Sequence, residues 1–254
     1  MDVLVLAGGS VSKSDPLSSL AGDQPKSMVP IAGKPMVQWV LDALSSAELV
    51  DSVAVIGLDD SCGLHCVKRL TYLPDTGSLL QNIQRGAEHF SQVTPADSHI
   101  LSVSADVPAV TPEIIDACIR IFNAREFDIY YSVIERSAME KRFPDSRRTY
   151  LKLKDGEVCG GDVNCIRKKA ALDPDSAWSG LIERRKNPIK QASMIGWGTL
   201  LLLMTGMLTL DNAASRVCQR LGIQGKALKM PYPEIGMDVD KPFQHNIVER
   251  DLLR

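Results

Sequence analysis

The sequence predicts an α/β protein of three layers, with helices on both faces of a mostly parallel central sheet. Short apolar runs bounded by glycine or charged residues indicate buried strands, and we expect them at 2–6, 53–57, 99–104 and 128–133. Segments of helical length alternate with these runs, at 36–47, 78–90, 111–123 and 243–252. Because strands that alternate with helices favour parallel pairing, this order predicts an open α/β sheet.

The first residues of two helices support these boundaries. Ser78 is placed to cap the helix that runs to Phe90. Thr111-Pro112-Glu113 supplies an N-cap, a proline at the first helical position and an acid in the first turn.

Later elements are predicted in the same way. Residues 150–153 alternate as a strand and end at a hairpin turn, 154–156. The charged segment 135–148 has no period and predicts an excursion over the substrate side. A helix at 210–221 and an edge strand at 225–230 precede the last helix.

Length and charge limit the class of protein. We expect residues 1–254 to form a single domain, with 135–172 as a subdomain or insertion on the substrate side. The formal net charge of -2 argues against a general nucleic-acid binder. Residues 136–190 carry 14 Lys and Arg against 8 Asp and Glu. This basic segment indicates either an anionic ligand or an ordinary solvated surface.

The six cysteines predict no disulfide framework. They lie at 62, 66, 118, 159, 165 and 218, in a chain that opens on a buried strand and not on a signal peptide. Neither close pair has the two-residue spacing of a zinc ribbon, which disfavours structural zinc. We therefore expect reduced thiols and a cytoplasmic location.

The opening stretch predicts a phosphate site. The apolar run ends at Ala7-Gly8-Gly9, where bare backbone can approach a ligand. No third glycine follows at the step that a dinucleotide fingerprint needs, and Pro25 and Leu20 stand where a P-loop requires glycine. What remains is a strand, a Gly-Gly turn, a polar loop, and two lysines, Lys26 and Lys34, ahead of a helix.

These residues resemble the nucleotidyltransferases of the molybdenum-cofactor guanylyltransferase-like and sugar-1-phosphate type, whose signature is L-A-[AG]-G followed by P-K-x-x-x-x-x-x-G-K-P. The resemblance implies a Rossmann-like, glycosyltransferase-A-like fold. It also implies that nucleotide binding involves Leu6, Ala7, Gly8, Gly9, Lys13, Lys26, Gly77 and Ser78. Lys13 stands where the family usually has arginine, which can bind phosphate through two parallel N–H groups. Gly77 and Ser78 open a helix, so free backbone N–H groups there would face the edge of the sheet. In the resembled family, a glycine-containing turn at this place reads the base of the nucleotide.

Three carboxylates are the metal candidates. Asp106 follows a predicted central strand, at the edge where open α/β sheets bind ligands. It matches the family's x-x-D-x-P, and Asp240 matches an acid of the C-terminal D-x-D-x-P motif, with Asp238 in support. Mg²⁺ or Mn²⁺ is the expected cofactor, because hard cations bind carboxylates and phosphates. We expect Lys26 and Asp106 to be catalytic.

A second glycine pair marks the expected acceptor side. Gly160 and Gly161 permit close backbone approach, and Asp162 and Asn164 add polar groups. Family members commonly carry G-G-N here, so Asp162 is a departure that bears on the identity of the substrate.

The stretch 192–210 holds 19 residues without a charge. A membrane span needs about 20 apolar residues, but glycines and threonines interrupt this stretch. The favoured interpretation is a buried or interface-forming helical hairpin, which would allow a homodimer. Peripheral membrane contact, assisted by Arg184, Arg185 and Lys186, stays open.

Together the motifs predict a Mg²⁺-dependent nucleotidyltransferase. It would transfer a nucleoside monophosphate from a nucleoside triphosphate to a phosphorylated small-molecule acceptor and release pyrophosphate. The departures at Lys13 and Asp162 leave open an inactive nucleotide-binding regulatory or scaffold protein of the same fold. The glycine spacing disfavours a nicotinamide-dependent oxidoreductase.

Overall fold

The computed structural model describes residues 1–9, 16–22, 24–123, 126–173, 199, 202–203 and 205–254. Nine strands of this part of the chain form one sheet in the order β5-β4-β1-β6-β10-β7-β9-β8, with β11 paired to β7. Their bounds are β1 (Asp2–Leu6), β4 (Ser52–Ile56), β5 (Arg69–Leu73), β6 (His99–Ser104), β7 (Ile129–Glu135), β8 (Leu151–Leu153), β9 (Gly156–Gly160), β10 (Val163–Arg167) and β11 (Gly225–Lys229). A separate small ribbon consists of β2 (Pro30–Ile31) and β3 (Lys34–Pro35).

The sheet is mostly parallel. β5, β4, β1 and β6 are parallel neighbours, and β11 is parallel to β7. β10 runs antiparallel between β6 and β7, and β9 runs antiparallel between β7 and β8. The predicted mostly parallel α/β sheet is therefore confirmed.

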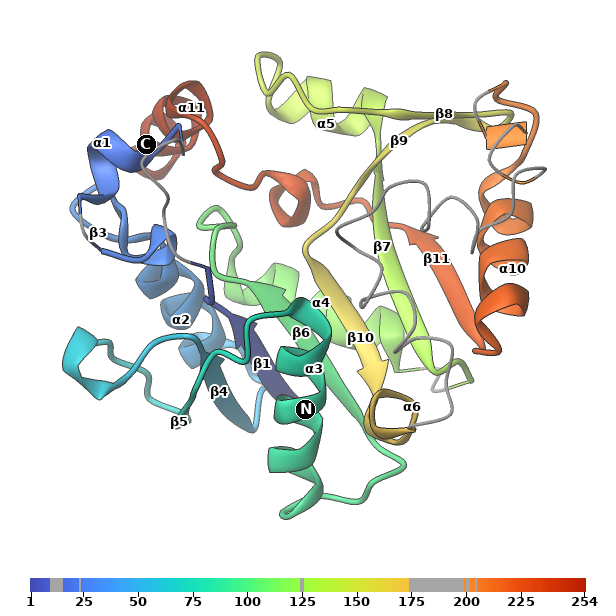
Figure 1. Cartoon of the computed structure of the whole chain (residues 1–254). Coiled ribbons are helices and arrows are strands. Elements are labelled where there is room, and N and C mark those ends of the chain that lie inside the picture. The colour runs from blue at the N-terminus through green and yellow to red at the C-terminus, as the bar shows by residue number, and fades with distance from the viewer. Residues whose placement is uncertain (10–15, 23, 124–125, 174–198, 200–201, 204) are drawn as a thin grey trace.

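Helices cover both faces of the sheet (Figure 1). The helices are α1 (Ser18–Ala21), α2 (Met36–Ser46), α3 (Leu79–Ser91), α4 (Pro112–Phe122), α5 (Arg136–Arg142), α6 (Lys168–Leu172), α10 (Leu210–Leu221) and α11 (Pro242–Leu252). Successive side chains of a strand point to opposite faces. Accordingly, Val3 and Val5 pack with the apolar residues of α2 and α4, whereas Leu4 packs with those of α3. A central strand buried on both faces explains why the opening run is uniformly apolar.

The parallel register brings three strand ends to one edge of the sheet. Leu6 pairs with Ile56 on one side and with Ser104 on the other. The residues that directly follow β1, β4 and β6 therefore lie at the same edge of the sheet. Gly57, which follows β4, is one of them. Gly57 has a φ of 96°, and a Cβ on it would lie 2.4 Å from the Cα of Gly8. Only glycine permits this approach, which fixes the opening turn against the next strand.

Most predicted elements are confirmed within a residue or two, and Ser78 and Thr111 cap their helices as expected. The expected excursion at 135–148 is wrong in its first half, because β7 extends to Glu135 and α5 follows directly. The strands β5, β9 and β10 were not predicted. Because β10 lies between β6 and β7, the segment 135–172 contributes to the main sheet.

Much of the uncharged stretch 192–210 lies outside the described residues, as do Arg184, Arg185 and Lys186. Among the residues that are described, no helix has the length and apolar character needed to cross a membrane.

Candidate active site

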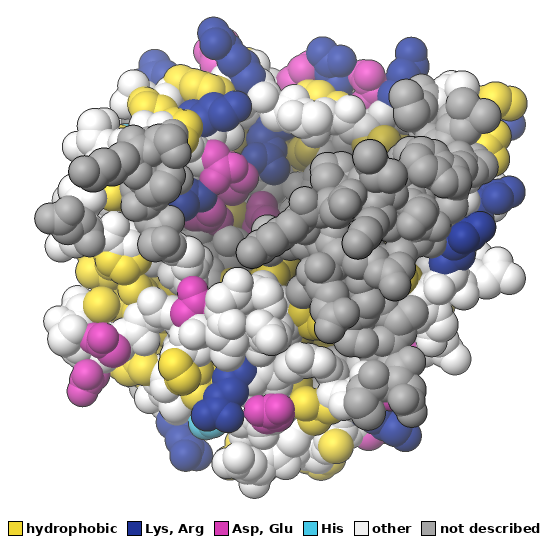
Figure 2. All heavy atoms as spheres, viewed as in Figure 1, with side chains coloured by type: hydrophobic (Ala, Val, Ile, Leu, Met, Phe, Trp, Pro, Cys, Tyr) yellow, Lys and Arg dark blue, Asp and Glu magenta, His cyan; other side chains and the backbone are white. Residues whose placement is uncertain are grey.

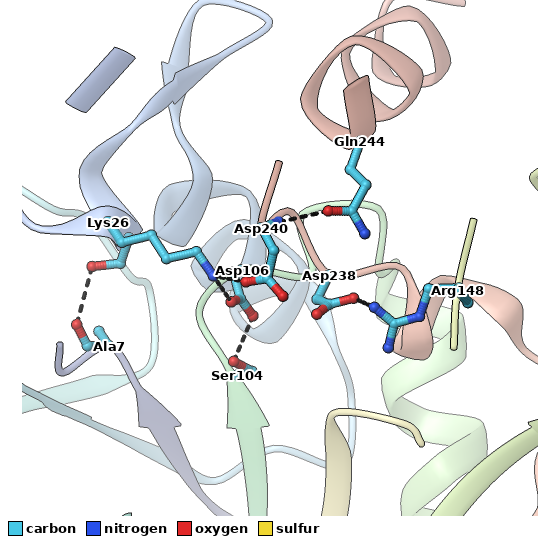
Figure 3. Close-up of polar contacts among 9 residues, drawn as sticks. Ala7, Lys26, Ser104, Asp106, Arg148, Asp238, Asp240 and Gln244 are labelled. Atoms are coloured by element: carbon cyan, nitrogen blue, oxygen red, sulfur yellow. Dashed lines mark hydrogen bonds and ion pairs between the residues drawn. The ribbon is translucent and has the colours of Figure 1, made fainter. Parts of the chain in front are cut away.

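A lysine lies between two carboxylates at the carboxyl edge of the sheet (Figure 3). The Nζ atom of Lys26 is 2.6 Å from Oδ2 of Asp106, and it also contacts Oδ1 of Asp240. Burial lowers the pKa of Lys26, but the two carboxylates together outweigh this effect and hold the pKa above its ordinary value of 10.5. The three residues come from distant parts of the chain and were predicted as one site.

Local contacts hold each of these groups. Asp106 follows β6, and its Oδ1 accepts a hydrogen bond of 2.6 Å from Ser104 Oγ. The backbone carbonyl of Asp106 accepts a bond of 2.9 Å from the N–H of Val239, which joins the C-terminal segment to the end of β6. The N–H of Asp240 donates to Gln244 in α11 over 3.0 Å.

Lys26 is attached to the opening turn through its neighbour. Ser27 Oγ donates to the carbonyl of Ala7 over 3.2 Å. Ala7 is itself almost fully buried, and its N–H bonds to Ile56. The backbone of Ala7 thus supports the site from within the sheet. Lys34, the other lysine of the opening stretch, pairs with Asp42 and lies 3.7 Å from the ring centroid of Trp39, so it is engaged elsewhere.

The convergence of Asp106 and Asp240 on one positive charge fits a divalent cation. Mg²⁺ usually takes one or two protein carboxylates and completes its coordination with water and substrate phosphates. Within the described residues, no group of three or more His, Cys, Asp or Glu is arranged to hold a metal. Two carboxylates would leave the other coordination positions of such a cation to water or to a ligand.

Asp238 is oriented differently from Asp240. It forms an ion pair with Arg148, and Figure 3 shows it between the Lys26 cluster and that arginine. Asp238 is thus near the other two carboxylates, but Lys26 does not contact it. Arg148 was missed by sequence reasoning, because nothing distinguishes it from the other charged residues of 135–148.

A pocket of about 690 Å³ lies beside these carboxylates. Figure 2 shows acidic and basic side chains gathered in a hollow on this face. Residues of the predicted nucleotide and acceptor sites line it together: Leu6, Gly8, Gly9, Gly77, Ser78, Gly161, Asp162 and Asn164. The structure therefore brings the two predicted halves to one cavity. Lys13 lies outside the described residues.

At the end of the pocket that was predicted to bind the nucleotide, Asp75 links the two glycine turns. Its Oδ1 accepts hydrogen bonds from the N–H of Gly77 over 2.8 Å and from Nδ2 of Asn82 over 3.0 Å. With a further backbone bond from Gly9, these bonds hold the pKa of Asp75 below its ordinary value. The N–H of Gly77 is therefore used within the protein.

Asp75 and Asn82 were not predicted as site residues. The pattern that could have revealed Asp75 is the alternation in Arg69–Leu73, which forms β5 and ends just before it. Recognising that strand would have placed Asp75 at the same sheet edge as Gly8.

At the end that was predicted to bind the acceptor, close neighbours leave little room for a side chain at either glycine. A Cβ on Gly160 would lie 2.7 Å from the hydroxyl of Tyr131, and one on Gly161 would lie 2.9 Å from Cβ of Ser132. Asn164 accepts from the N–H of Ser132 over 2.9 Å and donates to the carbonyl of Gly161 over 3.1 Å. This amide holds β10 against β7 while lining the pocket.

Asp162 has the most perturbed carboxyl group of the pocket. Burial and the nearby negative charge of Asp106 raise the pKa of Asp162 to about 7, and the positive charge of Arg148 opposes this shift. Asp240 and Lys26 act on it as well. A carboxyl group that titrates near neutral pH becomes negatively charged as the pH rises, unlike the uncharged Asn common in the resembled family.

Comparisons with known proteins agree with this geometry. The family model described as the MobA-like NTP transferase domain matches residues 3–187. The solved structure of a hypothetical transferase from Thermus thermophilus is 33% identical with a TM-score of 0.82, over 96% of this chain and 98% of that one.

Two more distant proteins are also similar. The structure of a CMP:2-keto-3-deoxy-manno-octonic acid synthetase complexed with CTP is 15% identical with a TM-score of 0.60, over 99% of this chain and 98% of that one, and it shares the fold. A 3-deoxy-manno-octulosonate cytidylyltransferase from Synechococcus elongatus is 29% identical over 105 residues. That alignment covers 40% of this chain and 41% of the relative, so the chain spans less than half of the relative's length. By its family model and its fold, the chain belongs to the MobA-like NTP transferase family.

Proposed function

We propose that this protein is a Mg²⁺-dependent nucleotidyltransferase that transfers a nucleoside monophosphate to a phosphorylated small-molecule acceptor. The observation that carries the proposal is the contact of one ammonium, Lys26, with both Asp106 and Asp240 beside the Gly8-Gly9 turn. Residues 1–254 would act as one domain, in which 135–172 contributes the acceptor side.

The reaction needs positioning and charge neutralisation more than covalent participation of the protein. A phosphate oxygen of the acceptor attacks the α-phosphorus of the nucleoside triphosphate and forms a new P–O bond. The bond from the α-phosphorus to the oxygen that bridges to the β-phosphorus breaks, and pyrophosphate leaves with that electron pair. The acceptor oxygen is already anionic, so no general base is required.

The residues of the chain supply the surroundings of this step. The Gly8-Gly9 turn and the Asp75 network hold the nucleotide, and Lys26 stabilises the negative charge that develops on the transferred phosphoryl group. Asp106 and Asp240 would hold Mg²⁺ or Mn²⁺. When bound, this ion neutralises the phosphates and orients them for in-line displacement.

The test is pyrophosphate release by the full chain with each of the four nucleoside triphosphates, Mg²⁺ and a panel of phosphorylated acceptors. CTP is the first nucleotide to try, because the relative from Synechococcus elongatus is a cytidylyltransferase. Asp106→Asn is the inactive control. The transfer reaction would be rejected if no combination of nucleoside triphosphate and acceptor gave more pyrophosphate with wild type than with Asp106→Asn. In that case, metal-independent stabilisation by nucleotides would favour a binding protein.

A further inference from the structure

Arg148 closes the far end of a row of charged side chains in the cleft. Figure 3 shows Lys26 at one end, Asp106, Asp240 and Asp238 in between, and Arg148 at the other end. The side chains of Arg148 and Asp238 are 15% and 16% exposed. The pair is therefore largely buried, and Arg148 is near enough to Asp162, a residue that lines the pocket, for its charge to act on that carboxyl group.

We propose that Arg148 binds the phosphate group of the acceptor, an inference that rests on the proposed transfer to a phosphorylated acceptor. The ligand class is a phosphate monoester. Its anionic group would lie between Arg148 and the Asp162 side of the pocket, opposite the nucleotide end.

Charge balance is the first argument. Asp162 lies where four charged side chains act on it: Asp106, Asp240, Lys26 and Arg148. In the proposed reaction, Lys26 acts on the transferred phosphoryl group of the nucleotide, so it does not serve the phosphate of the acceptor. An anionic acceptor that enters among these carboxylates needs a cationic side chain of the protein beside it, because like charges in a low-dielectric cleft repel strongly. Of the described cations that act on Asp162, Arg148 is the one on the acceptor side.

The donors of the guanidinium give the second argument. Arginine carries five N–H donors. The guanidinium of Arg148 forms an ion pair with Asp238, and the thiol of Cys159, a weak acceptor, accepts a hydrogen bond from it. The Nε–H is buried and has no oxygen acceptor. This buried Nε–H does not face the pocket, but among the described residues Asp238 and Cys159 also leave donors of the Nη groups unused, and these are the donors that a phosphate would engage.

The backbone next to Arg148 is the third argument. Arg147 has a φ of 48°, in the left-handed region that residues other than glycine rarely adopt. Its guanidinium lies 5.3 Å from the ring centroid of Phe243 at the start of α11. Such strain is retained when the surroundings stabilise it, and it is frequent at ligand sites. Here it sends consecutive arginines in different directions, with Arg148 toward the carboxylates.

A purely structural role for Arg148 makes a different prediction. If the arginine served only to fix the segment around Asp238, removing either partner of the ion pair would have the same effect. If Arg148 binds the acceptor, loss of the arginine weakens anion binding, whereas loss of Asp238 releases the guanidinium and does not.

Inorganic phosphate is the probe that separates these roles. The full chain is first saturated with Mg²⁺ and the α,β-methylene analogue of whichever nucleoside triphosphate stabilises it most, and phosphate is then titrated calorimetrically. Wild type is compared with Arg148→Gln, Arg148→Lys and Asp238→Asn. Arg136→Gln is the matched control, because this exposed arginine pairs with Glu140 and Glu157 away from the cleft.

We expect Arg148→Gln to weaken phosphate binding by about tenfold or more, and Arg148→Lys to weaken it less, since lysine keeps the charge but loses the two-pronged contact. Arg136→Gln should bind phosphate as wild type does, within about twofold, because its ion pairs are exposed. Asp238→Asn should bind phosphate at least as tightly as wild type, because the change releases the guanidinium of Arg148. Should Arg148→Gln fail to fold, the lysine variant carries the test, because it must still weaken binding measurably.

The proposal is overturned if wild type does not bind phosphate in the presence of the nucleotide analogue. It is also overturned if Arg148→Gln or Arg148→Lys binds phosphate as tightly as wild type does. Equal losses of phosphate affinity in Arg148→Gln and Asp238→Asn would overturn it as well. Pyrophosphate release by wild type is measured separately. Arg148-dependent phosphate binding without any release would reject the transfer reaction and keep the anion site. Pyrophosphate release by wild type, together with unchanged phosphate affinity in Arg148→Gln, would keep the transfer reaction and reject the anion site.

Discussion

Nζ of Lys26 lies 2.6 Å from Oδ2 of Asp106, although 80 positions separate the two residues in the sequence. The same nitrogen contacts Asp240. Replacing Lys26 by Met should lower kcat by about 10²- to 10³-fold, because a donor directed at the developing phosphoryl charge is lost. KM should change much less. Steady-state kinetics of pyrophosphate release measures both.

Lys34→Met is the matched control for this variant. Lys34 belongs to the same opening motif, but it pairs with Asp42 and Trp39. Its replacement should change kcat by less than about threefold, as for a partly exposed ion pair. Equal losses in the two variants would show that Lys26 has no special role.

Asp75→Ala should weaken nucleotide binding. The change removes the acceptor of the bonds from Gly77 and Asn82 and the bond from Gly9, so both turns lose their common support. We expect the dissociation constant of the nucleotide to rise about tenfold, with a loss of folding stability of about 1 kcal/mol. Calorimetric titration and urea unfolding measure the two effects.

The control for Asp75 is Asp60→Ala, an exposed carboxylate in the loop after β4. Nucleotide affinity should be unchanged in this variant. If Asp75→Ala binds nucleotide as tightly as this control does, the Asp75 network does not shape the site.

The contact of Gly57 with Gly8 predicts a stability difference that is independent of catalysis. In Gly57→Ala the new methyl group meets backbone at 2.4 Å, and φ is 96°. We expect a loss of about 2–4 kcal/mol in the free energy of unfolding, because backbone must shift to accommodate it. Urea unfolding of the variant measures this loss.

Gly63→Ala is the comparison that isolates the clash. Gly63 also has a positive φ, 64°, but nothing lies within 4 Å of its would-be Cβ. This variant should lose only about 1 kcal/mol, the cost of the left-handed backbone. A loss in Gly57→Ala no greater than this would contradict the packing argument.

Site residues that belong to a local sequence pattern could be predicted from the sequence. Site residues that are brought together only by tertiary contacts could not. Asp106 and Lys26 could be named because a strand end and a glycine turn have patterns of their own. The partnership of Arg148 with Asp238 joins two charged residues in loops, where no periodicity restricts either one. A strand such as β10 was missed because small and polar residues of Val163–Arg167 interrupt its apolar run.

Lys168 is a further case of this kind. It is fully buried, and its Nζ donates to the carbonyl of Thr94 over 3.0 Å and to the carbonyl of Phe90 over 3.3 Å. A lysine in a basic segment normally indicates an exposed side chain. Its burial follows only from the packing of α6 against the end of α3, which sequence patterns do not specify.

The titration of Asp162 predicts a pH-dependent stability. Burial and the charge of Asp106 raise the pKa of Asp162 from 3.8 to about 7. Between these values the folded chain binds a proton that the unfolded chain has lost, so this group lowers stability as pH rises from about 4 to about 7. Asp162→Asn removes the penalty while keeping the shape of the side chain.

We therefore expect Asp162→Asn to be more stable than wild type at about pH 8 by about 1–3 kcal/mol, and the difference to vanish near about pH 4. Urea unfolding at a series of pH values measures it. Asp145→Asn, at an exposed position, should show no such trend. A gain in Asp162→Asn that stays constant with pH would mean that packing, and not titration, separates it from wild type. Because an amide cannot carry the charge that Asp162 gains near neutral pH, the same series measures what this departure from the family's Asn costs the fold.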